Sequence, residues 1–389
     1  MKPKAMIVAG VMSGTSADGI DVALVEITPA KGRPRLTLLA HEGFRYPAAL
    51  RRAVLAAMNA TSTTTAELAR LNWRLGLAYA EAVKATVRRH TVQIDLIGCH
   101  GQTLYHQARA AFYAGKSFAC TWQAGEAALV AAEMGVPVVS NFRPADMTVG
   151  GQGAPLVPLL DFVMFSDPKR GRVLQNIGGI ANLTALPAGA YGDKVFAFDT
   201  GPGNMVIDGL AQTLFNKSYD RNGAIAARGQ VLAPVLTEIL RDPYFKLKPP
   251  RTTGREQFGR EYAVKLLTAC RRASRKPEDA LATATALTAE SIVGSFTQFV
   301  LPKMKHAPID YIVSGGGARN TTLMRMLAMK LEPLGCTLTT TEPFGMPAEA
   351  KESAAFALMA WMTWHQLPGN IPSATGAKRP AILGQISYA

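Results

Sequence analysis

The feature that most constrains the fold is a strand–turn–strand pattern that occurs twice in the chain. Residues 7–24 begin apolar, pass through a glycine-, serine- and threonine-rich turn, and become apolar again after Asp21. Residues 173–184 repeat the pattern around Gly178 and Gly179. Apolar runs interrupted by glycine and small polar residues are typical of two strands joined by a tight turn. Because each half of the chain begins in this way, the sequence predicts two related α/β domains that face each other across a cleft.

The first turn has the chemistry of a phosphate-binding loop. Gly14 and Gly19 allow the backbone to approach a ligand closely, and successive turn amides can form an anion-binding nest. Asp18 and Asp21 would repel a phosphate unless a divalent cation lay between them, so the turn suggests a metal-bound phosphate. An ordinary hairpin is the alternative, and Asp21 could equally hydrogen-bond the turn amides.

Periodicity and capping signals predict the remaining elements. Thr64 and Glu67 form a capping box at the start of a helix over residues 64–90. A short apolar strand at 95–99 ends at His-Gly-Gln-Thr, and the carboxyl ends of strands are where α/β proteins place ligands. Further strands are expected at 36–46, 136–140, 195–199 and 311–314, and further helices at 125–134, 205–215, 282–301, 321–330 and 348–364.

Composition narrows the class of protein. The 389 residues carry a net charge of +14. Because the basic residues are scattered, a solvated surface is favoured over nucleic-acid binding. An anionic small substrate would also suit a positive field. No window of eighteen apolar residues predicts a membrane span. Lys2 and Lys4 before an apolar run faintly resemble a signal peptide, but the run is short and is interpreted as a first strand. Four cysteines without a paired spacing favour reduced thiols and a cytoplasmic protein, not a disulfide framework or a zinc site.

Seven motifs together closely resemble one family. They are Gly-Thr-Ser-Ala-Asp-Gly-Ile-Asp at 14–21, Cys-His-Gly-Gln-Thr at 99–103, Asn-Phe-Arg at 141–143 with Asp146, Gly-Gly-Gln-Gly-Ala-Pro at 150–155, Gln-Asn-Ile-Gly-Gly-Ile-Ala-Asn at 175–182, Phe-Asp-Thr-Gly-Pro-Gly-Asn at 198–204, and Ser-Gly-Gly-Gly at 314–317. The chain resembles the anhydro-N-acetylmuramic acid kinases of the acetate and sugar kinase/Hsc70/actin superfamily. The likeness extends from residue 7 to about 360. Ala17 and Ser353 depart from the family pattern, where a larger apolar residue and an alanine are usual.

The resemblance implies a fold and a reaction. We expect an α/β fold of two actin-like, ribonuclease H-like domains with an active-site cleft between them. Domain I would cover residues 1–142, with a segment at about 360–389 packing back onto it, and domain II would cover 143–360. The implied reaction converts 1,6-anhydro-N-acetylmuramic acid, ATP and water into N-acetylmuramic acid 6-phosphate and ADP, a step in cell-wall sugar recycling. The resemblance also allows a homodimer, with no nucleic-acid or membrane partner.

The resemblance also implies a role for each motif. Asp199 would be the catalytic base, although it could instead cap the helix that follows it. Arg143 would contact the sugar, although it could pair with Asp146. The ATP-binding residues would be Gly14, Thr15, Ser16, Ala17, Asp18, Gly19, Ile20, Asp21, Gly178, Gly179, Gly315, Gly316 and Gly317. The sugar-binding residues would be Gly101, Gln102, Thr103, Arg143 and Asn204, and Asp18 and Asp21 would hold Mg²⁺ through water.

Two other functions fit the same sequence. A different sugar or carboxylate kinase of the superfamily would phosphorylate a free hydroxyl and would need no water at C1. A non-enzymatic, nucleotide-dependent binding protein of the chaperone or actin kind would need no sugar site. The sugar-side motifs at 101–103 and 143 argue against the second alternative.

Overall fold

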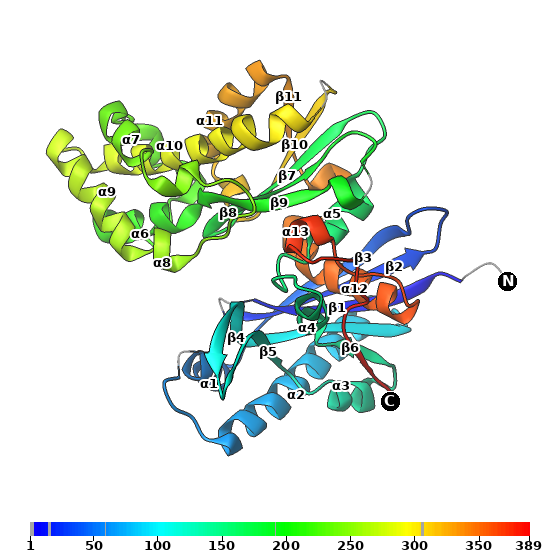
Figure 1. Ribbon diagram of the computed structural model, residues 1–389. Helices are drawn as coiled ribbons and strands as arrows, with labels where there is room; N and C mark the ends of the chain where they lie inside the picture. Colours follow the sequence, from blue (N-terminus) through cyan, green and yellow to red (C-terminus); the bar gives the residue numbers. More distant parts are fainter. Residues whose placement is uncertain (1–3, 15–16, 59, 191, 305–306) are drawn as a thin grey trace. The chain divides into compact units, whose positions relative to one another are not determined.

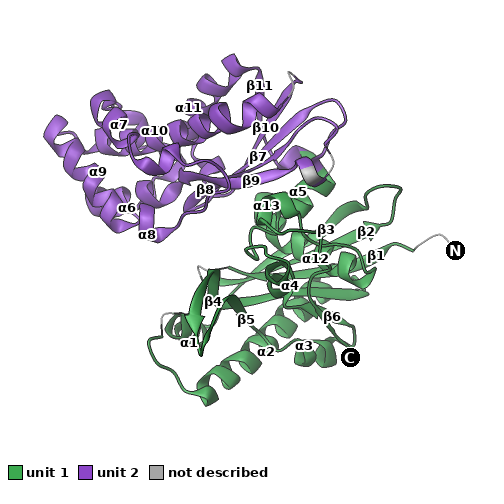
Figure 2. Cartoon of the chain, in the orientation of Figure 1, with its two compact units in different colours: residues 1–164, 344–389 green, residues 165–343 purple. Residues whose placement is uncertain are grey.

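The computed structural model describes residues 4–14, 17–58, 60–190, 192–304 and 307–389. These residues form two compact units (Figure 2). Unit 1 contains residues 1–164 and 344–389, and unit 2 contains residues 165–343. Unit 2 is therefore an insertion into unit 1. The boundaries expected from the sequence, at 142 and about 360, differ from these because the segments around both positions pack within unit 1.

Unit 1 is built on a mixed sheet (Figure 1). Its strands run in the order β12-β6-β4-β1-β2-β3, and β5 pairs with β4. The first three strands of the chain are antiparallel neighbours, whereas β1, β4 and β6 are parallel. The strands are β1 (Met6–Ser13), β2 (Gly19–Thr28), β3 (Arg35–Arg45), β4 (Leu96–Tyr113), β5 (Lys116–Ala124), β6 (Val138–Ser140) and β12 (Gln385–Ser387).

Helices cover both faces of this sheet. They are α1 (Ala48–Met58), α2 (Thr65–His90), α3 (Ala127–Met134), α4 (Phe142–Thr148), α5 (Pro158–Phe165), α12 (Lys351–Trp364) and α13 (Pro372–Thr375). The predicted capping box is confirmed, since the Thr64 hydroxyl accepts the Glu67 N–H and the Glu67 carboxylate accepts the Thr64 N–H. One apolar core lies between the sheet and the helices α1, α2 and α3.

Helix α12 packs on β1, β2 and β4, and two glycines allow its backbone to approach the sheet. Gly10 and Gly98 are paired neighbours on β1 and β4. A Cβ atom at Gly98 would lie 2.2 Å from the carbonyl oxygen of Phe356, and one at Gly10 would lie even closer to the carbonyl oxygen of Ser353. Because no side chain fits there, both positions require glycine.

The loop around Asp146 also belongs to unit 1. The fully buried Asp146 carboxylate accepts hydrogen bonds from Asn370 Nδ2 and the Thr375 hydroxyl, both at 2.7 Å, and from the Gly153 N–H at 2.8 Å. These bonds join residues on either side of the inserted unit, which explains why residues 143–164 stay with unit 1.

Unit 2 repeats the strand order of unit 1. Its sheet runs β11-β10-β7-β8-β9, with β7, β8 and β9 antiparallel and β7, β10 and β11 parallel. The strands are β7 (Gly171–Ile177), β8 (Ile180–Leu186), β9 (Phe196–Pro202), β10 (Ile309–Ser314) and β11 (Cys336–Thr340). An antiparallel meander followed by two parallel strands is the ribonuclease H-like order. Its presence in both units confirms the predicted pair of α/β domains.

The helices of unit 2 are α6 (Asn204–Phe215), α7 (Ala233–Ile239), α8 (Arg255–Phe258), α9 (Arg260–Ala273), α10 (Pro277–Ser295) and α11 (Thr321–Leu331). Helix α10 is buried on most of its surface, because α6, α9 and α11 all pack against it. Asn320 caps α11 by accepting the Leu323 N–H at 3.0 Å. Across the described residues, no helix is both long and apolar enough to cross a membrane.

Candidate functional site

A buried network of side chains forms hydrogen bonds with the predicted phosphate turn of unit 1. Gln102, on β4, is fully buried. Its Oε1 accepts the Ser13 hydroxyl at 2.7 Å, and its Nε2 donates to the Gly14 carbonyl at 3.1 Å. The Ser13 hydroxyl also lies 2.7 Å from the Tyr46 hydroxyl. Gln102 therefore positions the turn, a task that the sequence analysis did not give to this residue.

The backbone of the turn has a specific shape. Ala17 has a positive φ of 50° and a fully buried side chain, and its carbonyl accepts the Arg51 Nε–H at 3.2 Å. A Cβ atom at Gly19 would lie 2.2 Å from the carbonyl oxygen of Phe44, so β3 closes on the turn from one side. The small Ala17, which departs from the family pattern, is therefore part of the core. Thr15 and Ser16 lie outside the described residues.

The two carboxylates predicted to serve Mg²⁺ differ in their surroundings. The Asp21 side chain is 46% exposed, and its Oδ1 lies 3.1 Å from His41 Nε2. Asp18 is exposed, and its carbonyl accepts the Tyr46 N–H at 3.1 Å. Mg²⁺ usually binds one or two carboxylates together with phosphate oxygens and waters. Carboxylates that remain partly open to solvent fit that kind of site.

Arg143, predicted to contact the sugar, lies against His100. Its Nε donates to His100 Nε2 at 3.0 Å and its Nη1 donates to the Gly153 carbonyl at 2.7 Å, so Arg143 does not pair with Asp146. Burial and the neighbouring guanidinium hold the pKa of His100 well below its usual 6.5. The imidazole is therefore neutral, and its Nε2 accepts a hydrogen bond from the Arg143 guanidinium. Burial lowers the pKa of Arg143 to about 10, so this side chain stays cationic at neutral pH.

Glu352 is a residue of this site that the sequence analysis missed. It lies in the first turn of α12. It keeps exposed surface, but burial of its carboxyl raises its pKa, the Arg143 charge lowers it, and the Asp21 charge raises it. Arg143 and Asp21 are thus both close enough to act on Glu352. A carboxylate in the first turn of a largely apolar helix was its signal in the sequence.

The two remaining sugar-side residues follow His100 on β4. Gly101 has a φ of 79°, and a Cβ atom there would lie 2.8 Å from the Ala124 carbonyl. The Thr103 hydroxyl accepts the Gln123 Nε2–H at 3.3 Å. Unit 1 therefore brings Gly101, Gln102 and Thr103 together with the turn on β1 and β2, because β4 is the parallel neighbour of β1.

In unit 2 the glycine motifs converge around the start of α6. The carbonyls of Gly178 and Gly179 accept the backbone N–H groups of Asn204 and Met205 at 2.8 and 3.1 Å. A Cβ atom at Gly203 would lie 2.3 Å from the Gly178 carbonyl oxygen, so only glycine allows this approach.

Asn204 joins this turn to the third glycine motif. Its Nδ2 donates to the Ile177 carbonyl at 3.2 Å. Gly315 has a φ of 81°, and a Cβ atom there would lie 2.8 Å from the same Ile177 carbonyl. A Cβ atom at Gly317 would lie 2.3 Å from the Ile177 side chain. Unit 2 therefore brings together Gly178, Gly179, Asn204, Gly315, Gly316 and Gly317, as a nucleotide site would require.

Asp199, the predicted base, lies on β9 and is not a helix cap. Burial raises the pKa of its carboxyl to about 6, although the Thr253 N–H, which donates to Oδ2 at 2.8 Å, and the Arg251 charge both lower it. Its backbone carbonyl is fixed by Tyr244 Oη at 2.8 Å and Arg251 Nε at 2.9 Å. Within the described part of the chain, no hydrogen bond reaches Oδ1. A general base works best when its pKa is near the operating pH, and burial moves the pKa of Asp199 toward the neutral range.

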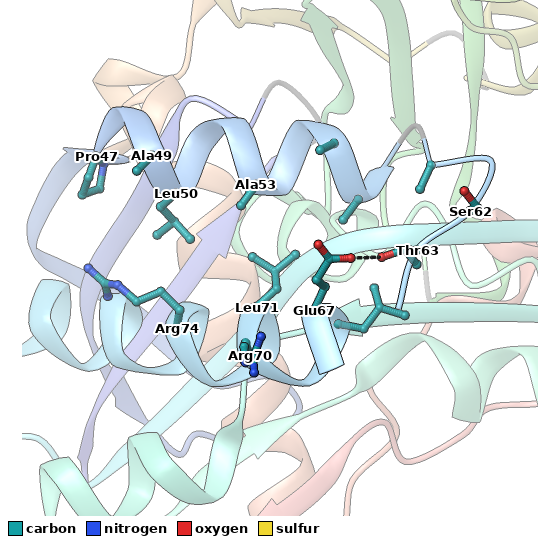
Figure 3. Close-up of a pocket in the computed structure, with 14 residues that line it drawn as sticks. Pro47, Ala49, Leu50, Ala53, Ser62, Thr63, Glu67, Arg70, Leu71 and Arg74 are labelled. Carbon is teal, nitrogen blue, oxygen red and sulfur yellow. Dashed lines mark hydrogen bonds between the residues drawn. The ribbon is translucent and has the colours of Figure 1, made fainter. Parts of the chain in front are cut away.

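Unit 1 also contains a cavity of about 640 Å³ (Figure 3). The cavity lies between α1 and α2. Its walls are mainly alanine and leucine, with Glu67, Arg70 and Arg74 on the α2 side. None of the predicted site residues lines it.

Two ribonuclease H-like units, each with a glycine turn after its first strand, have the fold of the sugar kinase and actin class of proteins. The sequence model of the family "Anhydro-N-acetylmuramic acid kinase" matches residues 6–389. The chain belongs to that family and is an enzyme of the kinase class.

Two relatives at 43% identity support this assignment. The anhydro-N-acetylmuramic acid kinase of Bacillus cereus (strain AH187) is 43% identical over 386 residues, which cover 98% of this chain and 99% of the relative. That of Bacillus anthracis is also 43% identical, over 387 residues with the same coverage. Among solved structures, the activator of 2-hydroxyisocaproyl-CoA dehydratase from Clostridium difficile with bound ADPNP aligns with a TM-score of 0.44 and 11% identity, over 93% of this chain and 96% of that one.

Proposed function

We propose that this chain uses ATP to convert 1,6-anhydro-N-acetylmuramic acid and water into N-acetylmuramic acid 6-phosphate and ADP. The family supplies the substrate, and the observation that carries the mechanism is the half-buried Asp199 carboxyl, whose pKa is raised to about 6 and whose Oδ2 is held by the Thr253 N–H. The product would return a cell-wall sugar to cytoplasmic metabolism.

The anhydro ring determines what the base must do. O6 is an ether oxygen without a proton, so it becomes a nucleophile only when the C1–O6 bond breaks. Asp199 removes a proton from a water molecule, whose oxygen forms a bond to C1. The C1–O6 electron pair moves to O6, which bonds to the γ-phosphorus while the bond from phosphorus to the ADP oxygen breaks. Asp199 then releases its proton to solvent.

One carboxyl is sufficient for this sequence of bond changes. Glycosidases normally need a second, acidic carboxyl to protonate the leaving oxygen. Here the phosphoryl group takes the place of that proton. We therefore assign Asp199 alone to proton transfer.

The other residues bind and orient. The turn at residues 14–21, supported by Gln102, approaches the transferred phosphate, and the glycines at 178–179 and 315–317 approach the remaining phosphates and the adenosine. Arg143 would bind the substrate carboxylate, since its charge is retained and His100 holds its orientation. Asp18 and Asp21 would hold Mg²⁺ through water. The metal ion would supply charge stabilisation for phosphoryl transfer. Asn204, whose amide already binds the Ile177 carbonyl, would fix the start of α6 beside the sugar.

The test is ADP release with Mg-ATP and 1,6-anhydro-N-acetylmuramic acid, beside N-acetylmuramic acid, N-acetylglucosamine and no sugar. We expect ADP only with the anhydro sugar. A repeat in oxygen-18 water should place the label at C1 of the product. ADP with a free sugar and no label at C1 would contradict the proposal and favour a kinase that phosphorylates a free hydroxyl. The absence of ADP with every sugar would favour the binding-protein alternative.

A further inference from the structure

Unit 2 buries an arginine whose charge has no acidic partner. Arg251 lies in the segment between α7 and α8, and only 6% of it is exposed. Among the described residues, no carboxylate forms an ion pair with its guanidinium. A buried charge without such a partner is costly. The surroundings of Arg251 must therefore compensate for that cost in another way.

Backbone carbonyls take the place of a carboxylate around Arg251. Its Nε donates to the Asp199 carbonyl at 2.9 Å. Its Nη1 donates to the carbonyls of Leu247 and Tyr244 at 2.8 and 3.1 Å, and its Nη2 donates to the Ser295 hydroxyl at 2.6 Å. The planar guanidinium carries its donors in a fixed fork. Because the acceptors belong to β9, to the segment after α7 and to α10, this one side chain joins three parts of unit 2.

Aromatic rings complete the cage around the guanidinium. Its central carbon lies 4.9 Å from the ring centre of Tyr244 and 5.4 Å from those of Phe198 and Phe299. Phe198 precedes Asp199 on β9, and Phe299 lies in the π-helical turn Phe296–Val300 that follows α10. A ring face attracts a cation that lies within about 6 Å of its centre. The cage therefore suits a cation and would be left with unpaired carbonyls by an apolar side chain.

The segment that contains Arg251 also holds Asp199. The Asp199 N–H donates to the Arg251 carbonyl at 3.1 Å. The Asp199 carbonyl accepts Arg251 Nε and Tyr244 Oη, and its carboxylate Oδ2 accepts the Thr253 N–H at 2.8 Å. These bonds fix the backbone from which the carboxyl projects and one of its two oxygens. The direction of the other oxygen, Oδ1, is therefore set as well.

Arg251 also supplies the positive charge beside this carboxyl. Burial raises the pKa of Asp199 most and the Glu256 charge raises it further, whereas the Thr253 N–H and the Arg251 charge lower it. The Tyr244 hydroxyl stays neutral, because burial raises its pKa above the usual value. Among the described groups that act on the Asp199 carboxyl, Arg251 is thus the cation. Its charge opposes the effect of burial and favours the carboxylate that a base requires.

We propose that Arg251 is a positioning residue for the base, because its caged guanidinium fixes the backbone of Asp199 and its charge keeps the carboxyl ionised. The inference rests on the proposed role of Asp199 and adds a residue that acts through it. A misplacement of about 1 Å at a reacting group can lower a rate about 10²-fold. A purely structural arginine would affect stability but neither the pH profile nor kcat of the folded enzyme.

The first test compares two substitutions of Arg251. Arg251→Met removes the charge and the donors, whereas Arg251→Lys keeps the charge and can still donate to the carbonyls. We expect kcat of the Met variant to fall about 10²-fold at about pH 7.5, with KM for ATP changed by less than about twofold. The lower limb of its kcat/KM profile should move up by about one pH unit. Arg251→Lys should keep the native limb and recover most of kcat.

A second test removes only one hydroxyl of the cage. Tyr244→Phe keeps the ring over Arg251 but loses the bond to the Asp199 carbonyl. We expect kcat to fall about threefold to tenfold, the equivalent of one hydrogen bond. Tyr262→Phe is the matched control. Tyr262 belongs to the same aromatic cluster through Phe258, and its buried hydroxyl makes no hydrogen bond within the described part of the chain, so its loss should leave kcat unchanged.

A double-mutant cycle on thermal unfolding gives a readout that does not depend on turnover. Asp199→Asn should raise the Tm at about pH 7.5 by about 3–6 °C more in the Arg251→Met chain than in the native chain. The reason is that the buried carboxylate costs more when the neighbouring charge is gone.

The outcomes separate this inference from the proposed reaction. Sites without coupling in the cycle, an unmoved pH limb in folded Arg251→Met, or equal losses of kcat in Tyr244→Phe and Tyr262→Phe would overturn the positioning role alone, provided that the native chain releases ADP. If Arg251→Met does not fold, the two tyrosine variants decide. Coupling in a native chain that releases no ADP would overturn the proposed reaction and support the link between Arg251 and Asp199.

Discussion

Replacing Asp199 with Asn should lower kcat by orders of magnitude while making the protein more stable. The carboxyl has an ordinary pKa of 3.8, and burial raises it to about 6 in the folded protein. The folded state therefore disfavours the charged carboxylate. Asn is neutral, has nearly the same shape, and can still accept the Thr253 N–H. The free energy of unfolding should rise in the variant at neutral pH because the cost of burying a charge is removed.

The size and sign of this effect follow from proton binding. Between pH 4 and pH 6 the folded carboxyl holds its proton and the unfolded one does not, so the native protein loses stability as pH rises through this range. A shift of about two pKa units corresponds to about 3 kcal/mol above pH 6, and to about half of that at pH 5. For a unit of this size the gain at about pH 7.5 is about 6–12 °C in the Tm of unit 2.

The assay is scanning calorimetry of the native and Asn chains at about pH 5 and about pH 7.5, with kcat measured in parallel. We expect kcat to fall by about 10²–10⁴, and kcat/KM of the native enzyme to decline as pH falls through about 6. Asp208 on α6 offers a matched control, because burial and Asp220 raise its pKa to about 6 as well. Asp208→Asn should gain stability and keep its activity. An Asp199→Asn variant that is no more stable than the native protein, or a gain that is the same at both pH values, would refute the reasoning.

Three further changes test other parts of the structure. Lys351→Met breaks the buried ion pair in which Lys351 Nζ lies 2.7 Å from Asp161 Oδ1. The free energy of unfolding should fall by about 3–5 kcal/mol because the Asp161 charge is left buried and unpaired. The double variant with Asp161→Leu should regain stability, as thermal unfolding would show. Gly203→Ala forces a Cβ atom against the glycine turn and should weaken nucleotide binding measured by calorimetry, whereas Gly294→Ala, an exposed α10 position with open space around it, should stabilise the helix by about 1 kcal/mol. Gln102→Met keeps the side-chain volume but removes the amide that binds the Ser13 hydroxyl and the Gly14 carbonyl. The free energy of unfolding, measured by chemical denaturation, should fall by about 1–3 kcal/mol. An unchanged free energy of unfolding would contradict the positioning role.

The sequence predicted those elements whose signals are local. The helix over 64–90 became α2 because its capping box and apolar stripe agree. The strand–turn–strand units at 7–24 and 173–184 became β1–β2 and β7–β8. The strand predicted at 95–99 was wrong in length, since β4 continues through Gly101 to Tyr113. The glycine after His100 indicated an end, but pairing with β5 maintains the strand through a positive φ.

Features that depend on distant residues could not be read from the sequence. The sequence placed Gln102 beside a substrate, and only the fold shows that it also binds Ser13 and Gly14. Glu352 joins the surroundings of Arg143 only because α12 returns to the sheet after the inserted unit. The individual assignments of sugar, nucleotide and metal contacts remain predictions.

The insertion of unit 2 into unit 1 has a consequence for how the chain acquires its structure during synthesis. A ribosome completes residues 165–343 before it makes α12 and β12, so unit 2 can fold while one face of the unit 1 sheet has no helix over Gly10 and Gly98. The apolar strands around those glycines stay open to other chains until the last 46 residues emerge. A chain that lacks residues 344–389 should therefore contain a folded unit 2 joined to an aggregation-prone N-terminal segment of unit 1. Chaperone demand should be highest late in translation.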